Sequence, residues 1–282
     1  EGIERLMLDE LEGMLYSDLI GFQTPRDAHM YAVLVDKHVE GARVRENPDD
    51  SYSIEYKDHI ARSEAFPISI DTDAIRDYVT GTQMSFRFED GTYLYDEVQA
   101  AERDGVLVAA KIGRLDYTKA FKENMLIAEK LSQMGLPIKY FVIAATTRES
   151  LNAYEKVRNE AIWLAKEINR RNYERLGYEL IFFRNEQIPF GINIFRLMTE
   201  SFIYLDASKI DGKHLTPEEA TIAKSVLPYD KRGIIIVGEN TGTGWQHGAA
   251  GFGPEDGLVI INPEDIEKSA ASIFHAIKSG YN

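Results

Sequence analysis

Two cationic residues, Arg114 and Lys119, lie five residues apart in a segment that joins an apolar run to an amphipathic one. The segment reads Lys111-Ile-Gly-Arg-Leu-Asp-Tyr-Thr-Lys119, and its pattern predicts a turn from a strand into a helix. Two cations on such a turn can converge on one anion, and the amides of a helix N-terminus add donors and partial positive charge. A solvated loop with a local Arg–Asp ion pair is the alternative, and the spacing alone leaves both open.

A second strand-to-helix turn is predicted at Asp211-Gly-Lys-His-Leu-Thr-Pro-Glu-Glu219. Thr216 and Glu219 have the spacing of a capping box around Pro217, a residue suited to the first helical position. That interpretation needs no function. The functional hypothesis is that free amides between Gly212 and Thr216 face a phosphate while Asp211 binds a sugar hydroxyl. The two interpretations are compatible.

A glycine-rich segment, Gly242-Thr-Gly-Trp-Gln-His-Gly248, has His247 at the third glycine position of a dinucleotide fingerprint. No acidic residue follows on a strand at the required interval, so we expect a flexible loop near a ligand and not a dinucleotide site. The six histidines do not cluster at metal-ligand spacing, and we expect neither a metal nor a cofactor. No Gly-x-Ser-x-Gly motif is present to form a nucleophile elbow.

The composition narrows the function classes further. The 282 residues carry a net charge of −14, which disfavours nucleic acid or an anionic membrane as a partner but permits an anionic small ligand. The absence of cysteine excludes disulfides and thiolate nucleophiles. No apolar run approaches the about 18 residues of a membrane span, and no signal peptide opens the sequence, so a cytoplasmic location is expected. The sequence begins at Glu1 inside a helical pattern, and we therefore expect a fragment.

The periodicity of apolar residues predicts the elements that must position these turns. Helices are predicted at 3–15, 25–36, 121–134, 149–175, 217–227 and 263–278. Strands are predicted at 18–22, 106–112, 138–145, 178–183, 202–205, 233–237 and 258–261, with strand pieces between 51 and 70. The pattern weakens from 71 to 104, where we place a domain connection. Continuous Val/Ile/Leu strands that alternate with helices indicate an α/β domain with a doubly wound parallel sheet, and ligands bind beyond the carboxyl ends of such strands.

Four segments resemble, in order and roughly in interval, the trehalose-6-phosphate synthase family of glycosyltransferases. They are Asp18-Leu-Ile-Gly-Phe-Gln-Thr24, Phe66-Pro-Ile-Ser-Ile-Asp71, Arg114-Leu-Asp-Tyr-Thr-Lys119 and Asn262-Pro263, of which the third is the specific one. The resemblance covers nearly the whole chain and implies a GT-B fold of two Rossmann-like domains. It makes residues 1–100 the C-terminal portion of the N-terminal, acceptor-side domain. Residues 101–282 become a nearly complete donor-binding domain for a nucleotide sugar.

The resemblance also implies an activity. A retaining, metal-free transferase would move a hexosyl group, specifically glucosyl, from a nucleotide diphosphate sugar such as UDP- or GDP-glucose. The acceptor would be a phosphorylated sugar such as glucose 6-phosphate, as in α,α-trehalose-6-phosphate synthesis. Arg114 and Lys119 would hold the donor diphosphate and, with Asp211 on the donor sugar, form the catalytic set. Arg148 would bind the acceptor phosphate. The remaining donor-binding residues implied are Gly212, Lys213, His214, Leu215, Thr216 and Glu219, the last on the ribose hydroxyls.

The chain departs from the family pattern around the second turn. Ile210 stands where the synthases carry arginine, His214 replaces asparagine, and the family's Phe-Ala-Gly-Ala-Ala turn is Asn240-Thr-Gly-Thr-Gly244 here. The alternatives that stay open are a glucosylglycerol-phosphate synthase, a cyclitol-coupling pseudoglycosyltransferase and a non-catalytic sugar-phosphate-binding homologue. For His214 itself, either its amide alone serves the loop, or its imidazole is protonated beside the diphosphate and adds a third positive contact that partly compensates for the missing arginine.

Overall fold

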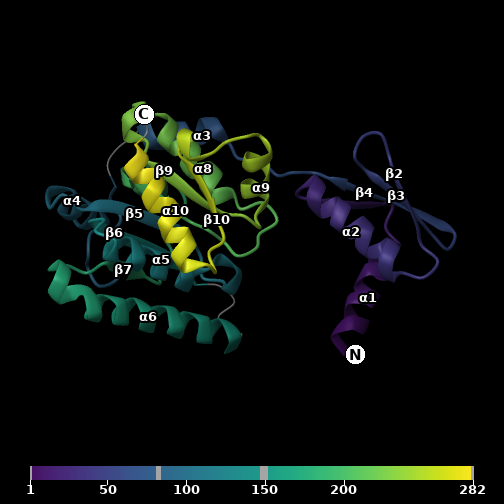
Figure 1. Ribbon diagram of the computed structural model, residues 1–282, viewed down its shortest axis with the longest axis horizontal. Coiled ribbons are helices and arrows are strands. Elements are labelled where there is room, and N and C mark those ends of the chain that lie inside the picture. The colour runs from purple at the N-terminus through teal and green to yellow at the C-terminus, as the bar shows by residue number, and fades with distance from the viewer. Residues whose placement is uncertain (1, 81–83, 147–151, 281–282) are drawn as a thin grey trace. The chain divides into compact units, whose positions relative to one another are not determined.

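The computed structural model describes residues 2–80, 84–146 and 152–280 and divides the chain into two compact units, 1–69 and 70–282. The first unit contains a four-stranded sheet in the order β1-β4-β3-β2 (Figure 1). Its strands are β1 (Leu19–Phe22), β2 (Arg43–Glu46), β3 (Tyr52–Tyr56) and β4 (His59–Ala65), and its helices are α1 (Gly2–Met14) and α2 (Pro25–His38). β1 runs parallel to β4, and the other pairs are antiparallel. Val35 of α2 packs with Ile54 and Ala61 of the sheet in the core of this unit.

The second unit is built on a six-stranded sheet in which every pair is parallel, as predicted. The strands are β5 (Leu107–Arg114), β6 (Ile138–Ala145), β7 (Ile181–Arg184), β8 (Ile203–Leu205), β9 (Ile234–Gly238) and β10 (Leu258–Ile261). Their order is β10-β9-β8-β5-β6-β7, so the chain winds outward from β5 in one direction and then from β8 in the other. The switch point between β5 and β8 is where open α/β sheets bind ligands, beyond the carboxyl ends of the strands.

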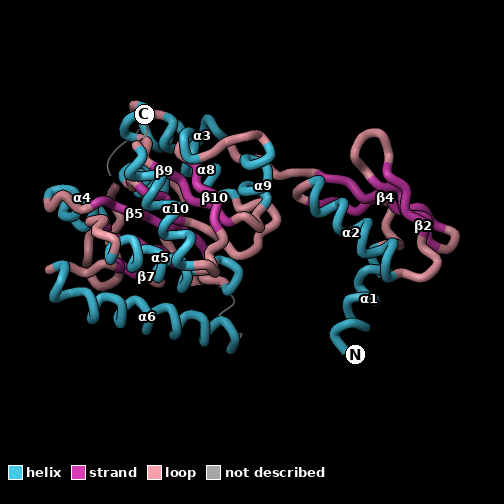
Figure 2. Tube along the Cα trace, in the orientation of Figure 1, coloured by secondary structure: helices cyan, strands magenta, loops and turns pink. Residues whose placement is uncertain are grey.

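Helices cover both faces of this sheet (Figure 2). They are α3 (Thr72–Thr80), α4 (Leu94–Arg103), α5 (Phe121–Gln133), α6 (Asn152–Leu176), α7 (Ile192–Glu200), α8 (Leu215–Ser225), α9 (Gly242–Ala249) and α10 (Ile266–Ser279). α5, α6 and α10 share one core with Ala109 of β5, whereas α3, α4, α7 and α8 share the other with Val108 and Ala110. This alternation follows from the two-residue side-chain period of a strand buried on both faces. The predicted fold class, α/β with a doubly wound parallel sheet, is confirmed.

The segment 71–104, expected to be a domain connection, instead forms part of the second unit. Ile75 and Val79 of α3, with Leu94 and Val98 of α4, are buried in the core that lies on one side of the six-stranded sheet. The compact units therefore divide at 69/70, whereas the sequence placed the domain boundary at 100/101. The interrupted polar pattern of this segment hid two short amphipathic helices, of which α4 packs on β5 and α3 packs on α7 and α8.

The glycine-rich segment is helix α9 and not a flexible loop, so that expectation was wrong. Thr241 caps the helix, and its hydroxyl oxygen accepts from the amide of Gly244 at 3.0 Å. A Cβ at Gly244 would collide with the carbonyl oxygen of Gly238. The glycine is thus required by the close approach of two backbone segments and not by flexibility. None of the helices within the described ranges is both long and apolar enough to cross a bilayer.

Candidate functional site

The two strand-to-helix turns lie next to each other at the carboxyl edge of the six-stranded sheet. β5 ends at Arg114 and β8 at Leu205, and these two strands pair in parallel through Ala109–Ile203 and Ala110–Tyr204. A backbone hydrogen bond from Lys209 N to Thr118 O, 2.8 Å long, joins the segments that follow the two strands. The sequence therefore identified the two loops that meet at the topological switch point.

Lys119 and Asp211 are brought into direct contact. The Lys119 Nζ lies 2.5 Å from Asp211 Oδ2, and both side chains are mostly buried, with 17% and 23% of their surface exposed. Asp211 Oδ1 also accepts from the amide of Lys213 at 3.1 Å. Burial acts to raise the pKa of Asp211, but the Lys119 ammonium outweighs it and the pKa lies below its ordinary value. Asp211 is thus held as a carboxylate beside a cation with further hydrogen-bonding capacity.

Arg114 is exposed, and its guanidinium makes no hydrogen bond or ion pair within the described residues. The local Arg–Asp pair considered from the sequence does not form. Asp116 instead caps a short 3₁₀ turn, Tyr117–Lys119, by accepting from the Thr118 amide at 3.0 Å. Arg114 is therefore available to a ligand at this edge.

A cluster of unused amides marks the start of α8. Within the described part of the chain, no acceptor takes the backbone N–H of Gly212, His214, Leu215 or Thr216. His214 is the N-cap residue and has a left-handed backbone with φ of 66°. The first turn of a helix presents its amides together with the positive end of the helix dipole, an arrangement that binds phosphate.

The predicted capping box does not form. α8 begins at Leu215, so Thr216 lies inside the helix and Pro217 occupies its third position. The Thr216 hydroxyl donates to Asp206 Oδ2 at 2.5 Å and not to a helical amide. Glu219 is half-buried, and burial, followed by the charges of Asp206 and Glu218, raises its pKa. The capping box is absent because the Thr216 hydroxyl binds the buried carboxylate of Asp206, a residue outside the predicted segment.

Two buried charged residues were missed by the sequence analysis. Lys111 and Asp206 are 1% and 2% exposed, and the Lys111 ammonium donates to Asp206 Oδ1. His214 Nε2 lies 3.2 Å from Asp206 Oδ2, so the imidazole points under the loop. Burial acts to raise the pKa of Asp206, but Lys111 and His214 hold it well below its ordinary range. The available signal was a lysine inside an otherwise apolar strand, which is expensive to bury without a partner.

Lys213 turns away from Asp211 and toward the helices beside the loop. Its ammonium lies 2.8 Å from Glu218 Oε1 and also donates to Gln246 of α9. The first amides of α9 are used as well, because Gly242 N donates to Asp211 O at 3.1 Å and Thr243 N to Lys213 O at 2.8 Å. Helix α9 therefore supports the loop from behind, and its N-terminus is not an additional anion site.

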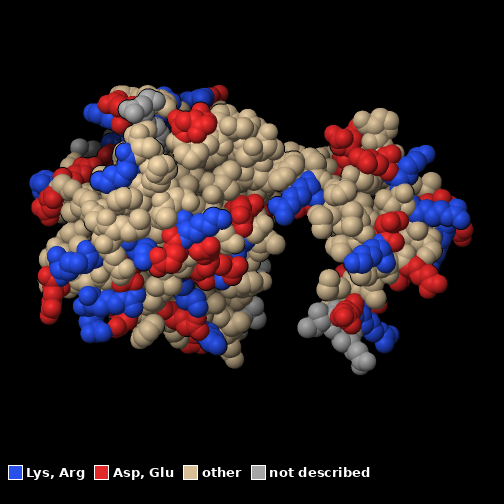
Figure 3. Space-filling view, in the orientation of Figure 1, with Lys and Arg blue, Asp and Glu red and all other residues tan. Residues whose placement is uncertain are grey.

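Arg148, expected to bind an acceptor phosphate, lies outside the described residues. In the ranges that are described, no group of three or more His, Asp or Glu side chains could hold a metal ion. Acidic and basic side chains are interspersed over the face shown in Figure 3. This distribution gives the visible face no continuous basic surface of the kind that binds nucleic acid.

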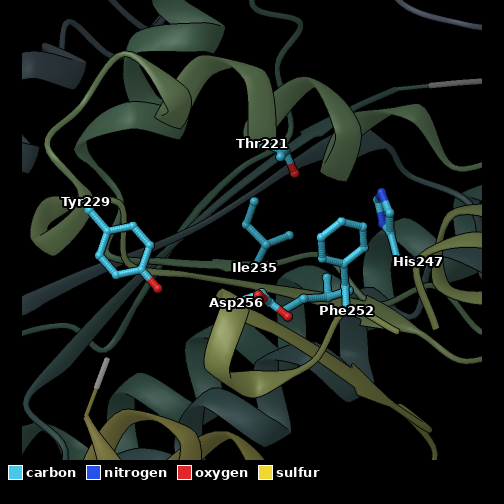
Figure 4. Close-up of a pocket in the computed structure, with 8 residues that line it drawn as sticks. Thr221, Tyr229, Ile235, His247, Phe252 and Asp256 are labelled. Atoms are coloured by element: carbon cyan, nitrogen blue, oxygen red, sulfur yellow. The ribbon is translucent and has the colours of Figure 1, made fainter. Parts of the chain in front are cut away.

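A cavity of about 280 Å³ lies beside α8, away from the unused amides at the start of that helix. The residues that line it include Thr221, Ile235 and His247 (Figure 4). Ile235 and Leu258 lie at the amino ends of β9 and β10. The cavity is therefore set apart from the carboxyl edge that carries Lys119 and Asp211. It does not belong to the candidate site.

Comparison with known proteins gives a family match over most of the chain. The model of glycosyltransferase family 20 matches residues 8–280. The chain is 25% identical over 260 residues to alpha,alpha-trehalose-phosphate synthase [UDP-forming] 1 of Aphelenchoides avenae, covering 88% of this chain and 21% of that protein. It is also 25% identical over 275 residues to the trehalose-6-phosphate synthase of Klebsiella pneumoniae, covering 95% and 52%. The chain thus spans about half or less of the length of these relatives.

Solved structures agree on the fold. The UDP-forming alpha,alpha-trehalose-phosphate synthase of Burkholderia xenovorans, in complex with glucose-6-phosphate, superposes with a TM-score of 0.79 at 21% identity, over 96% of this chain and 56% of that one. The E. coli structure bound with UDP-2-fluoro glucose gives a TM-score of 0.75 at 24% identity, over 96% and 55%. At this level of identity the likeness concerns the fold.

Proposed function

The chain belongs to glycosyltransferase family 20, and from this membership we propose that it supplies the donor site of a retaining glycosyltransferase. The enzyme moves a glucosyl group from a nucleotide diphosphate sugar, UDP- or GDP-glucose, to a phosphorylated sugar such as glucose 6-phosphate. The relatives named as UDP-forming trehalose-phosphate synthases support this choice, as do the solved relatives with glucose-6-phosphate and with UDP-2-fluoro glucose. Residues 70–282 are the donor unit, and residues 1–69 contribute to the acceptor side. A cytoplasmic location stays part of the proposal.

One observation carries the proposal: unused amides and a lysine share the switch-point edge of the parallel sheet. The amides of Gly212, His214, Leu215 and Thr216 are available at the start of α8, and the loop that bears them contacts Lys119 through Asp211. A diphosphate needs such donors and cations, because its oxygens accept several hydrogen bonds at once. The edge therefore suits the leaving group of a nucleotide-sugar reaction.

The side chains take complementary roles in the proposed reaction. Negative charge grows on the departing diphosphate as the glycosidic bond breaks, and Arg114, Lys119 and the loop amides neutralise it. An ammonium has three N–H donors, so Lys119 can keep Asp211 and still donate to a phosphate oxygen. Asp211 retains a second oxygen for a sugar hydroxyl. Glu219 binds the ribose, Lys213 and Leu215 shape the loop, and Arg148 stays a predicted acceptor-phosphate residue.

Calorimetric titration with UDP and with GDP tests the proposal. Lys119→Ala should weaken diphosphate binding about tenfold or more, the cost of losing a charge-assisted hydrogen bond. Lys122→Ala is the matched control, because Lys122 lies three residues away on α5 and pairs with Glu160 at 2.6 Å. Failure of the wild-type protein to bind either diphosphate would overturn the donor-site assignment.

A non-catalytic, sugar-phosphate-binding role is the second candidate, and Ile210 favours it. This side chain is 63% exposed on the loop where the family resemblance calls for an arginine. One cation fewer at a diphosphate reduces stabilisation of the transition state more than it reduces ground-state binding. Transfer from UDP-[¹⁴C]glucose to glucose 6-phosphate separates the two roles: binding without product formation selects the non-catalytic one.

A further inference from the structure

The buried carboxylate of Asp206 is contacted by three side chains. Lys111 belongs to β5, and His214 and Thr216 belong to the segment that carries the unused amides at the start of α8. Asp206 follows β8 directly, and its Oδ1 accepts a hydrogen bond from the ammonium of Lys111, a residue within β5. Its other oxygen accepts from the Thr216 hydroxyl at 2.5 Å and lies 3.2 Å from His214 Nε2. We propose that Asp206 is a positioning residue that ties the start of α8 to β5 and so sets where the donor phosphates bind. The inference rests on the proposed function of this edge.

The ion pair gives the carboxylate a fixed place. Lys111 and Asp206 are almost completely removed from water, and a buried charge that loses its partner is strongly destabilised. Lys111 is also held over the Phe121 ring, 4.9 Å from its centre, so the ammonium is confined by the first residue of α5. The Asp206 carboxylate therefore has one position that satisfies its cation.

The loop before α8 is held at the Asp206 carboxylate by two residues, His214 just before the helix and Thr216 in its first turn. His214 has the left-handed backbone of the N-cap, and its side chain is 1% exposed against Asp206. Thr216 lies two residues further along, on the first turn of α8. The backbone amides of His214 and Thr216 are two of the four with no acceptor in the described chain. The same two residues thus give their side chains to Asp206 and offer their amides to the site.

This arrangement makes His214 a buried support and not a surface cation. Its imidazole faces Asp206 and Ser208, whose Oγ lies 3.3 Å from Nε2. Preorganised amides stabilise a developing charge only if they are held in place before the reaction. Loss of the tie to Asp206 should therefore weaken phosphate binding without removing any group that contacts the phosphate.

Thr216→Val is the main test, since it removes the hydroxyl, keeps the side-chain shape and leaves the Lys111–Asp206 pair whole. Thr221→Val on the same helix is the matched control, because among the described residues its hydroxyl bonds only to the Pro217 carbonyl, at 2.8 Å. In the full chain we expect Thr216→Val to weaken UDP binding about five- to tenfold, as for a lost hydrogen bond to a charged group. The control should stay within about twofold of wild type, a change below the strength of a typical hydrogen bond. Thr216→Ser, which restores the hydroxyl, should recover most of the affinity.

A ligand-free measurement keeps this inference separate from the proposed function. The amide of Lys209 donates to Thr118 O of the neighbouring turn and the amide of Lys213 to Asp211 Oδ1 within the loop, so their hydrogen exchange reports how firmly the loop is held. Thr216→Val should accelerate their exchange, and Thr221→Val should not. Equal exchange and equal UDP affinity in the two variants would overturn the role of Asp206. Absence of UDP and GDP binding in wild type would instead overturn the proposed function, and the exchange rates alone would then decide whether Asp206 restrains the loop.

A second variant removes the ion pair as a unit. Asp206→Asn combined with Lys111→Met leaves neither member of the pair as an unpaired buried charge, so we expect the fold to be retained. We expect this double variant to show the same accelerated exchange at Lys209 and Lys213 as Thr216→Val. Wild-type exchange rates in the folded double variant would contradict the proposal.

Discussion

The ammonium of Lys119 and the carboxylate of Asp211 are 2.5 Å apart although 92 residues separate them in the chain. They follow neighbouring parallel strands, β5 and β8, whose carboxyl ends meet at the switch point of the sheet. A cation and an anion shared in this way can bind a phosphate and a sugar hydroxyl side by side. The relationship explains why two separate sequence motifs are needed for the proposed donor site.

Arg114 should contribute to the rate of transfer more than to folding. Because its guanidinium is exposed and has no partner in the described residues, Arg114→Ala should leave the melting temperature nearly unchanged. It should lower kcat by about 10²–10³, the cost of losing one preorganised donor at a developing charge. Steady-state transfer assays of the full chain measure this effect. The control is Arg170→Ala, which removes an arginine paired with Glu167 on α6, and equal kcat values would contradict the role of Arg114.

His214→Asn should alter donor binding to the same extent at pH 6 and pH 8. Asparagine tolerates the left-handed backbone of this N-cap, so the loop amides are kept. The imidazole lies against Asp206 and not on the surface, and the expected effect is on loop restraint. Calorimetric titration of UDP across this pH range distinguishes the two hypotheses. Extra affinity of the wild type at pH 6, lost in the variant, would show that the imidazole serves as a third cation for the diphosphate.

Lys224 should make the stability of the second unit depend on alkaline pH. It is 2% exposed, its ammonium donates to the carbonyl of Ser201, and burial lowers its pKa to about 7 although Glu200 opposes the shift. The unfolded chain then binds more protons than the folded one between the folded pKa and 10.5, so the free energy of unfolding rises with pH in that window. Each pH unit contributes at most about 1.4 kcal/mol.

Urea unfolding of wild type and Lys224→Met at pH 7, 8 and 9 measures this contribution. The variant lacks the titrating group, so the difference between the two proteins should shift in favour of the wild type as the pH rises. A difference that is constant over the three pH values would show that Lys224 keeps an ordinary pKa.

Gly244→Ala should destabilise the second unit, because an added Cβ would collide with the Gly238 carbonyl at the start of α9. Overpacking of this kind costs about 1–3 kcal/mol. Gly113→Ala is the control, since nothing lies within 4 Å of a Cβ at that position. Chemical denaturation of both variants tests the prediction. Equal unfolding free energies would mean that the contact between α9 and β9 relaxes without cost.

The strands and the two strand-to-helix turns could be predicted because their signals are local. Apolar runs mark strands that are buried on both faces, and the change to helical period after Arg114 marks a turn. The Lys111–Asp206 pair could not be predicted in the same way, because its partners are 95 residues apart and only the pairing of β5 with β8 brings them together. Helix α9 was missed since glycine disfavours helices, and a cap at Thr241 with close backbone packing overrides that preference.

The division of the chain before Ile70 decides which segment of this protein can be exchanged as a unit with the matching segment of a relative. Helix α4 packs on β5, and Phe88 packs on Phe182 of β7, so a segment that started at residue 101 would lose part of the apolar cover of this sheet face. Recombination between relatives would preserve the second unit only if the crossover fell upstream of α3. For evolution and for protein engineering alike, the point at which this unit can be exchanged whole lies before Ile70, whereas a crossover at 100/101, the boundary expected from the sequence, would divide the unit.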